Sequence, residues 1–203
     1  CDAYWRNGDI GDKDSKKRKN AIATYKYWID VAARLNCKAV RNVCGEYITV
    51  SHSEKLDYAI QGVRELGKYA ASKDLDLLIE NHNGYSSDPE WLIKLMNGVN
   101  LKNVGVLGDF TNWTLKRNPD IFYPDPYKGF EILAPYIRAI SAKSESFDKN
   151  GEETTTDFKR MFSILKSAPN FIYAGVEFSG NGISRNQGSV NTRKLIEKVL
   201  HNS

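Results

Sequence analysis

Apolar residues alternate between two spacings along the chain, and these spacings predict alternating helices and strands. Between Lys17 and Leu35 they recur at steps of three and four, the period of an amphipathic helix: Ala21, Tyr25, Trp28, Ala32 and Leu35. Asp14 or Ser15 is suited to cap this helix. Residues 39–43 (AVRNV) follow as a short β-branched run and predict a strand.

The same alternation continues to the end of the chain. A helix capped by Ser53 precedes the run LDLLIE at 75–80, whose nearly continuous apolar character is typical of a strand covered on both faces. Pro89 begins a helix that runs to about Asn97, and a polar, Pro-rich loop is expected over 118–126. Further strands are expected at 104–107, 138–143 and 171–178, and further helices at 127–133, 157–167 and 189–200.

These elements form one helix followed by strand–helix units, in which right-handed crossovers join parallel strands. An open doubly wound sheet and a (β/α) barrel both fit this order. The chain has no G-x-G-x-x-G and no complete G-x-x-x-x-G-K-[ST], the phosphate-binding motifs of the doubly wound class; GVRELGK at 62–68 is followed by Tyr69 instead of Ser or Thr. Charged residues instead end several successive strands, and in a barrel those ends converge on one face. The pattern therefore favours an α/β fold of the (β/α)8 TIM-barrel type.

The predicted units are fewer than a complete barrel requires. A complete barrel takes about 250 residues, whereas this chain has 203. We expect residues 1–203 to be a single partial barrel domain that lacks roughly the first two to three βα units, with about 80 residues preceding Cys1. A barrel without its first strands would expose open sheet edges.

Composition and charge narrow the class of protein. A hydrophobic content of 41%, a charged content of 27% and a formal net charge of +4 are typical of an ordinary globular domain. The basic run Lys16–Lys19 is compatible with a nucleic-acid patch, but a solvated helix face is the favoured interpretation. Cys1, Cys37 and Cys44 are too few for a disulfide framework, and no C-x-x-C indicates structural zinc. A cytoplasmic location is the default expectation, with a targeting signal upstream of Cys1 left open.

Three acidic residues lie at or near the ends of predicted strands: Glu80, Asp109 and Glu177. A carboxylate at the end of an apolar strand is unfavourable unless it is solvated, paired or bound to a cation. Taken singly, each acid could cap the following helix or pair with a Lys. Three like charges at equivalent positions instead favour a shared cation, and oxygen ligands from separate strands suit Mg²⁺ or Mn²⁺.

Four further residues near the same strand ends are candidates for substrate binding. Arg41 and Lys143 could bind a phosphate or carbonyl oxygen, or pair with an acid. His82 could contact substrate or simply lie in a loop, and Trp113 could form a stacking wall for a sugar or pack within its own loop. The run Thr154–Thr156 is expected to cap the next helix. The chain has no G-x-S-x-G and no H-E-x-x-H, so hydrolysis by these known arrangements has no support.

Four short segments occur in a characteristic order: LIENHNG at 78–84, GDFTNW at 108–113, AISAKS at 139–144 and GVEF at 175–178. They resemble the later strands of the xylose isomerase-like TIM-barrel superfamily, and in particular its sugar phosphate isomerase/epimerase group. The resemblance covers essentially the whole chain. It implies a divalent metal, Mn²⁺ or Mg²⁺, held by a Glu, an Asp, a His and a Glu from the last four strands. Glu80, Asp109 and Glu177 match three of these ligands, whereas Ser141 stands where the family's H-x-H-x-K pattern has its His, judged from Lys143.

The resemblance also implies an activity. In a sugar or sugar phosphate isomerase or epimerase of this kind, Glu80 and Glu177 would remove and return a proton alpha to a carbonyl while the metal stabilises the enediolate. A catalytically degenerate carbohydrate-binding barrel and a keto-sugar lyase on the same scaffold remain alternatives. The superfamily's endonuclease branch uses a His-rich multi-zinc site, and three His residues argue against it. The expected partner is a small sugar or sugar phosphate rather than nucleic acid or a membrane, and a homo-oligomer is left open.

Overall fold

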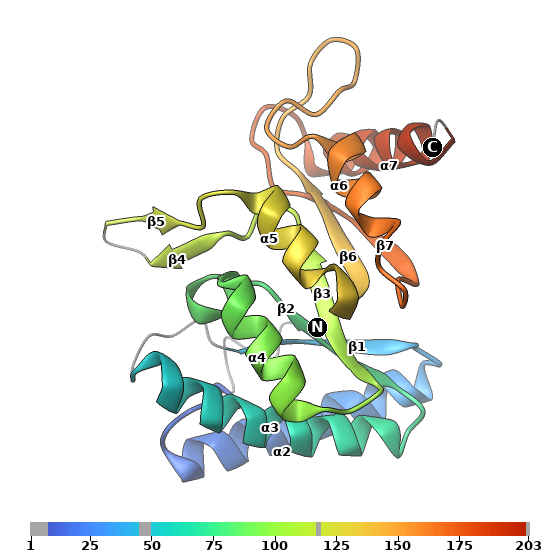
Figure 1. Ribbon diagram of the computed structural model, residues 1–203. Helices are drawn as coiled ribbons and strands as arrows, with labels where there is room; N and C mark the ends of the chain where they lie inside the picture. The colour runs from blue at the N-terminus through green and yellow to red at the C-terminus, as the bar shows by residue number, and fades with distance from the viewer. Residues whose placement is uncertain (1–7, 45–49, 117–118, 202–203) are drawn as a thin grey trace.

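The computed structural model describes residues 8–44, 50–116 and 119–201, and its centre is a sheet of five parallel strands (Figure 1). The strands are β1 (Ala39–Val43), β2 (Asp76–Glu80), β3 (Val104–Asp109), β6 (Ile137–Ser144) and β7 (Tyr173–Phe178). They lie in the order β1-β2-β3-β6-β7, and each pairs with its neighbours in parallel. The strands predicted from the sequence are confirmed, and Cys1 lies outside the described residues.

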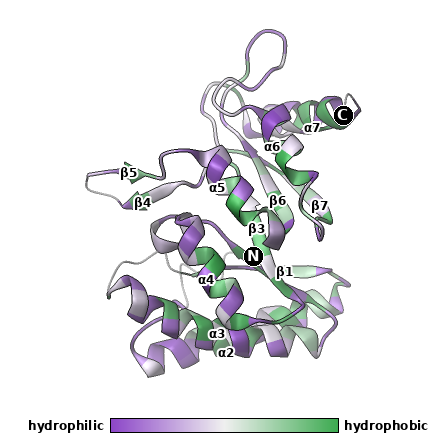
Figure 2. Ribbon diagram, in the orientation of Figure 1, coloured by the Kyte–Doolittle hydropathy of each residue, from purple (hydrophilic) through white to green (hydrophobic). Residues whose placement is uncertain are grey.

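Helices follow the strands and pack against one another in chain order. They are α2 (Ser15–Arg34), α3 (His52–Ala71), α4 (Pro89–Val99), α5 (Pro126–Leu133), α6 (Phe158–Leu165) and α7 (Arg185–His201). Two short 3₁₀ helices, η1 (Gly84–Ser87) and η2 (Ala134–Tyr136), precede α4 and β6. Figure 2 shows hydrophobic and hydrophilic residues side by side on most helices, as amphipathic elements require. None of the helices in the described ranges is long and apolar enough to cross a membrane.

Side-chain caps determine where several helices begin. The carboxylates that accept backbone N–H groups at the starts of α2, α4, α5 and α6 belong to Asp14, Asp88, Asp125 and Asp157. Ser51 caps α3 through a reciprocal pair of hydrogen bonds with Glu54. The predicted caps Ser53 and Thr154–Thr156 are therefore wrong, because Ser53 lies inside α3 and the Asp157 carboxylate reaches the first turn of α6 directly.

An antiparallel hairpin begins before the loop expected over 118–126, and its second strand lies within that loop. It consists of β4 (Thr114–Lys116) and β5 (Ile121–Phe122), which form a second sheet of two strands. Thr114 pairs with Phe122, and the register shifts before Lys116 pairs with Ile121. Strands this short and this exposed leave no alternating pattern in the sequence, so the hydrophobic spacing could not predict them.

The two faces of the main sheet differ in composition, because side chains alternate along each strand, and the charged side chains lie mostly on one of them. One face carries apolar residues that are fully buried in the core with the helices, among them Leu77, Ile79, Val106 and Ile140. The other face, called the inner face below, carries Arg41, Glu80, Asp109, Ser141, Lys143 and Glu177. Small residues alternate with them on this face: Gly105, Ala139 and Gly175.

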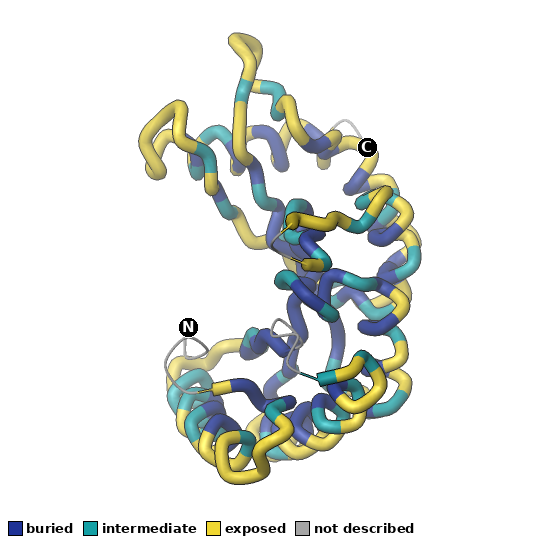
Figure 3. The backbone as a smooth tube through the Cα atoms, turned by 90° about the vertical axis from the view of Figure 1, so that its left-hand side faces the viewer, coloured by how far each residue is buried: buried dark blue, intermediate teal, exposed yellow. Residues whose placement is uncertain are grey.

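The main sheet is open, with β1 and β7 as its outer strands. Figure 3 shows the backbone as an open arc in which the buried strands lie inside and the helices outside. Parallel strands alternating with helices on one side are the layout of a TIM barrel. The described residues therefore form an incomplete (β/α)8 barrel, as the sequence predicts.

Candidate active site

The carboxyl ends of four strands bring the candidate residues together on the inner face. Asp109 of β3 lies opposite Ser141 of β6, and Lys143 of β6 lies opposite Glu177 of β7. Glu80, at the end of β2, lies opposite Leu107 of β3. Asp109 is two residues further along β3 and therefore points to the same face. The three acids that the sequence places at strand ends therefore belong to one cluster, and Lys143 is part of it.

Glu80 is buried, with 2% of its surface exposed. Its Oε2 forms an ion pair with Nε of Arg41, although the two atoms are not aligned for a hydrogen bond. Its Oε1 accepts a hydrogen bond from Nδ2 of Asn112 at 3.4 Å. Burial raises the pKa of Glu80 to about 8, Arg41 opposes this shift, and the charges of Asp109 and Glu177 add to it. The carboxyl group can therefore hold a proton at neutral pH.

Asp109 is fully buried. Its Oδ1 accepts hydrogen bonds from the backbone N–H groups of Thr111 at 2.8 Å and Asn112 at 3.0 Å. Its Oδ2 lies 3.4 Å from Nζ of Lys143. Burial raises the pKa of Asp109 to about 6, and the charge of Lys143 opposes this shift. The side chain is held in one orientation by its own loop and by the ammonium group.

Glu177 lies nearer the surface than the other two acids and has two donors. Its Oε2 accepts a hydrogen bond from Oγ of Ser141 at 2.6 Å, and its Oε1 lies 3.0 Å from Nζ of Lys143. Burial acts to raise the pKa of Glu177, but the Ser141 hydrogen bond and the charge of Lys143 outweigh it, so the pKa is lowered. Glu177 is therefore stabilised in its ionised form.

Lys143 links the two acids on either side of it. Its ammonium group contacts Asp109, Glu177 and the Oδ1 of Asn112, the last at 3.2 Å. Burial acts to lower the pKa of Lys143, but the two carboxylates outweigh it and raise the pKa. Three carboxyl groups and two cations, Arg41 and Lys143, thus share the inner face.

Two asparagines hold this cluster, and the sequence interpretation did not assign them a role. Asn81 is fully buried and bonds to both backbone groups of Asp109: its Oδ1 accepts from the N–H at 2.6 Å and its Nδ2 donates to the carbonyl at 3.0 Å. Asn112 donates to Glu80 and accepts from Lys143. Both lie inside the segments that carry the family resemblance, 78–84 and 108–113. Their position in these segments is the feature of the sequence that could have indicated a role for them. They tie the β2 and β3 loops together.

His82 and Trp113 occupy different environments around the cluster. His82 is half-buried, and burial followed by the charges of Arg41 and Lys143 lowers its pKa. Trp113 is 3% exposed, donates from Nε1 to the carbonyl of Phe110 at 2.8 Å, and has its ring near those of Tyr123 and Phe130. It also lines a cavity of about 490 Å³. Contact of either residue with substrate stays a prediction.

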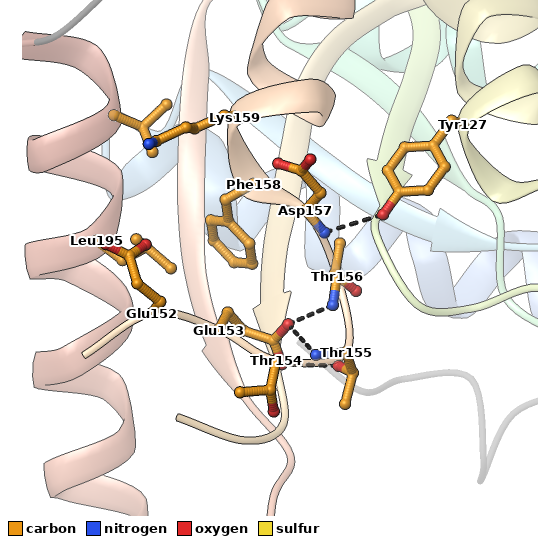
Figure 4. A pocket seen from close by; sticks show the side chains of 11 residues that line it. Tyr127, Glu152, Glu153, Thr154, Thr155, Thr156, Asp157, Phe158, Lys159 and Leu195 are labelled. Carbon is orange, nitrogen blue, oxygen red and sulfur yellow. Dashed lines mark hydrogen bonds between the residues drawn. The ribbon is translucent and has the colours of Figure 1, made fainter. Parts of the chain in front are cut away.

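A larger cavity of about 570 Å³ lies away from the carboxyl cluster, between the loop before α6 and helix α7. Figure 4 shows the Glu153 carboxylate turned toward the backbone of Thr155 and Thr156, and the Tyr127 hydroxyl accepting from the N–H of Asp157. The Glu153 carboxylate is already used by its own loop. The residues that line this cavity therefore stabilise the loop that leads into α6, and they are not part of the carboxyl cluster.

The cluster does not fit a divalent metal as it is arranged. Across the part of the chain that the structure describes, no group of three or more His, Cys, Asp or Glu side chains is placed to hold a metal ion. Lys143 contacts both Asp109 and Glu177, and Ser141 donates to Glu177 instead of providing an imidazole. The assignment of Glu80, Asp109 and Glu177 as metal ligands stays a prediction, and no chemical step below depends on it.

The fold and the charged inner face define an incomplete TIM barrel with a cluster of ionisable side chains at the carboxyl ends of its strands. The sequence matches the family described as "Xylose isomerase-like TIM barrel" over residues 3–198, so the chain belongs to this family. No curated protein shows significant sequence similarity to it.

Solved structures share this fold at low sequence identity. A D-tagatose 3-epimerase-like protein is 17% identical with a TM-score of 0.75, over 95% of this chain and 73% of that chain. A 3-keto-D-glucoside 4-epimerase from E. coli is 14% identical with a TM-score of 0.71, over 95% and 76%. A xylose isomerase-like TIM barrel protein from Mycobacterium smegmatis, in complex with magnesium, is 18% identical with a TM-score of 0.71, over 96% and 71%. At these identities the comparison establishes the fold.

Proposed function

We propose that the chain forms the active site of a sugar isomerase or epimerase that moves a proton on a carbon alpha to a carbonyl group. The observation that carries the proposal is a pair of glutamates, from β2 and β7, that lie on one face in environments that shift their pKa values in opposite directions. Glu80 is buried with a raised pKa, whereas Glu177 is stabilised as a carboxylate by Ser141 and Lys143. Groups whose environments separate their pKa values in this way are suited to act as acid and base.

The proton transfer follows from these two environments. Glu177 takes the proton from the carbon, the C–H electron pair forms a C=C bond, and the carbonyl oxygen acquires the negative charge of an enediolate. For epimerisation, Glu80 then delivers a proton to the opposite face of the same carbon: the C=C electron pair forms the new C–H bond, and the enediolate oxygen reforms the carbonyl. For isomerisation, the proton goes instead to the neighbouring carbon, and the proton of the hydroxyl that becomes the new carbonyl passes to the enediolate oxygen. Exchange with water returns Glu177 and Glu80 to their starting states. No oxidant, reductant or co-substrate is required.

The expected substrate contacts lie around this pair. Arg41 and Lys143 place positive charge where a carbonyl or phosphate oxygen would bind, and His82 and Trp113 remain proposed sugar contacts. The similar structures include sugar epimerases, which supports a carbohydrate as the substrate class. Another similar structure, of a xylose isomerase-like TIM barrel protein, is in complex with magnesium. In this chain Glu80, Asp109 and Glu177 match the metal ligands that the resemblance implies, but Lys143 already contacts two of them, so the proposed proton transfer is derived without a metal.

The test is solvent exchange, because it detects proton transfer before the natural product is known. A panel of ketoses, ketose phosphates and 3-keto-glycosides is incubated with the protein in D₂O, and loss of the proton alpha to the carbonyl is followed by NMR. We expect exchange with at least one member, and a loss of about 100-fold or more in Glu80→Gln and Glu177→Gln. The exposed Glu131 of α5 provides the matched control, Glu131→Gln.

Each other outcome has a defined meaning. Exchange at the wild-type rate in both glutamine variants would refute the assignment of the two glutamates. Sugar binding by calorimetry without exchange would indicate a degenerate carbohydrate-binding barrel. Elimination products in the mass spectrum would indicate a keto-sugar lyase that uses the same first proton abstraction.

A further inference from the structure

Every carboxylate oxygen of the charged cluster already has a partner within this chain. The donors to Glu177 are Ser141 at Oε2 and Lys143 at Oε1. The donors to Asp109 are two backbone N–H groups at Oδ1 and Lys143 at Oδ2. Glu80 faces Arg41 at Oε2 and Asn112 at Oε1. A metal ion would have to displace several of these groups at once.

Lys143 has the position that a shared cation would need. Its side chain is 13% exposed, its Nζ contacts carboxylates from two different strands, and the neighbouring position on the same face is Ser141. A serine hydroxyl is short and here acts as a donor to Glu177. The residue that the resemblance expects as an imidazole ligand therefore contributes a proton donor to the cluster instead.

We propose that the ammonium group of Lys143 is the resident cation of this site, in the position where the family resemblance expects a divalent metal. It neutralises Asp109 and Glu177 in the resting protein. During enolisation, which rests on the function proposed above, the N–H group that donates to Asn112 in the resting protein turns to the substrate oxygen that becomes negatively charged. The charge that develops is then stabilised by a fixed donor of the chain.

The inference has a readout that needs no substrate. Isothermal titration with MnCl₂ is carried out on the chelator-treated wild-type protein, on Lys143→Gln and on the control Lys128→Gln, which removes an exposed lysine of α5. We expect no saturable Mn²⁺ binding in the wild type or the control. Lys143→Gln is expected to acquire one Mn²⁺ site, because Asp109 and Glu177 lose their shared ammonium partner. Adding Ser141→His to Lys143→Gln is expected to tighten that site at least about tenfold, since imidazole is a good ligand.

Saturable Mn²⁺ binding to the wild type as tight as to Lys143→Gln would overturn the proposal, and so would a folded Lys143→Gln that binds no Mn²⁺. Circular dichroism establishes folding, and Lys143→Met provides a second uncharged variant if the glutamine protein does not fold. Where a substrate exchanges in D₂O, exchange in the wild type should persist in EDTA and fall about 100-fold in Lys143→Gln. If no substrate exchanges at all, the proposed function fails while the Mn²⁺ titration still decides the role of Lys143.

Discussion

Ser141 and Glu177 are joined by a 2.6 Å hydrogen bond that crosses from β6 to β7 on the inner face. The strand register does not place them opposite each other, because Ser141 faces Gly175 and Lys143 faces Glu177. Gly175 has no side chain, and a Cβ placed there would meet only the carbonyl oxygen of Ile140, at 3.3 Å. The Glu177 side chain therefore has room to lean back along β7 and reach the serine hydroxyl.

This contact predicts a kinetic effect of Ser141→Ala. A hydrogen bond to a charged group contributes about 1.5–3 kcal/mol, and without it burial would act on the Glu177 pKa with less opposition. We expect the D₂O exchange rate at neutral pH to fall about tenfold in Ser141→Ala. Ser141→Thr, which keeps a hydroxyl, should retain most of the rate, and the exposed Ser163 of α6 provides the control Ser163→Ala. Equal exchange rates in wild type and Ser141→Ala would show that this hydrogen bond does not affect the action of Glu177 as a base.

The two buried acids predict that stability falls with rising pH. In the folded protein the pKa of Glu80 is raised from 4.5 to about 8 and that of Asp109 from 3.8 to about 6. The folded state therefore binds protons more tightly than the unfolded state. This stabilisation is complete below the ordinary carboxyl values and is lost as the pH rises through about 6 and then about 8, by at most about 1.4 kcal/mol per pH unit for each proton.

Urea denaturation at a series of pH values measures this dependence. Glu80→Gln should remove the upper part of the decline and Asp109→Asn the lower part, whereas Glu131→Gln should leave the profile unchanged. A wild-type free energy of unfolding that rises steadily between about pH 5 and 8 would contradict the raised pKa values.

The order of elements and the position of the acids could be predicted from the sequence because both depend on local patterns. Apolar spacing locates each parallel strand, and an acid at the end of an apolar strand stands out against its neighbours. Alternation along the strands then places Glu80, Asp109 and Glu177 on the same face, as the register confirms. The β4–β5 hairpin was missed because its strands are too short to show a period.

The partners of the acids could not be predicted in the same way. Whether Lys143 pairs with an acid or stays unpaired and available to substrate depends on two things: the register between β6 and β7, and the side chain at position 141. Asn112 contacts Glu80 and Lys143, and its own backbone carbonyl accepts a hydrogen bond from Asn81 at the end of β2. Such contacts join residues far apart in the chain, and no spacing in the sequence reports them.

Breaking a buried ion pair outside the cluster is predicted to lower the free energy of unfolding by a large amount. Lys55 of α3 is 1% exposed and pairs with Asp9, and its Nζ also donates to the carbonyl of Gly11 at 3.1 Å. Removing one partner leaves an uncompensated buried charge, so Lys55→Met should lower the free energy of unfolding by about 3–5 kcal/mol. Lys26, whose pair with Glu65 is largely solvated, provides the control Lys26→Met, expected to lose about 0–1 kcal/mol.

A double-mutant cycle separates this pair from simple loss of packing. Asp9→Asn keeps the acceptor for the N–H of Gly11, a 2.7 Å bond, while it removes the charge. The protein that carries both Lys55→Met and Asp9→Asn should be more stable than the sum of the single losses predicts, by at least about 1 kcal/mol. Strict additivity in urea denaturation would show that the two charges are not coupled.

Replacing Gly62 of α3 by alanine is predicted to lower the stability of the protein, although alanine has the higher helix propensity. A Cβ at this position would lie 2.0 Å from the carbonyl oxygen of Ile10 and 2.9 Å from its carbonyl carbon. Ile10 is itself fully buried, so the loop before α2 cannot move away without opening the core. Alanine favours a helix over glycine by about 1 kcal/mol, but overpacking against fixed backbone costs about 1–3 kcal/mol.

Gly98 of α4 is the matched comparison, because the atoms that its Cβ would meet belong to the Ile60 side chain, with Cδ1 the nearest, and not to backbone. Rotation of Ile60 can relieve this contact, whereas no rotation moves the carbonyl of Ile10. Gly62→Ala should therefore be less stable than Gly98→Ala by at least about 1 kcal/mol in urea denaturation. Equal stability of the two variants would show that the loop before α2 can shift to accommodate a Cβ at position 62. The close packing of α3 on that loop would then not restrict the residue at this position to glycine.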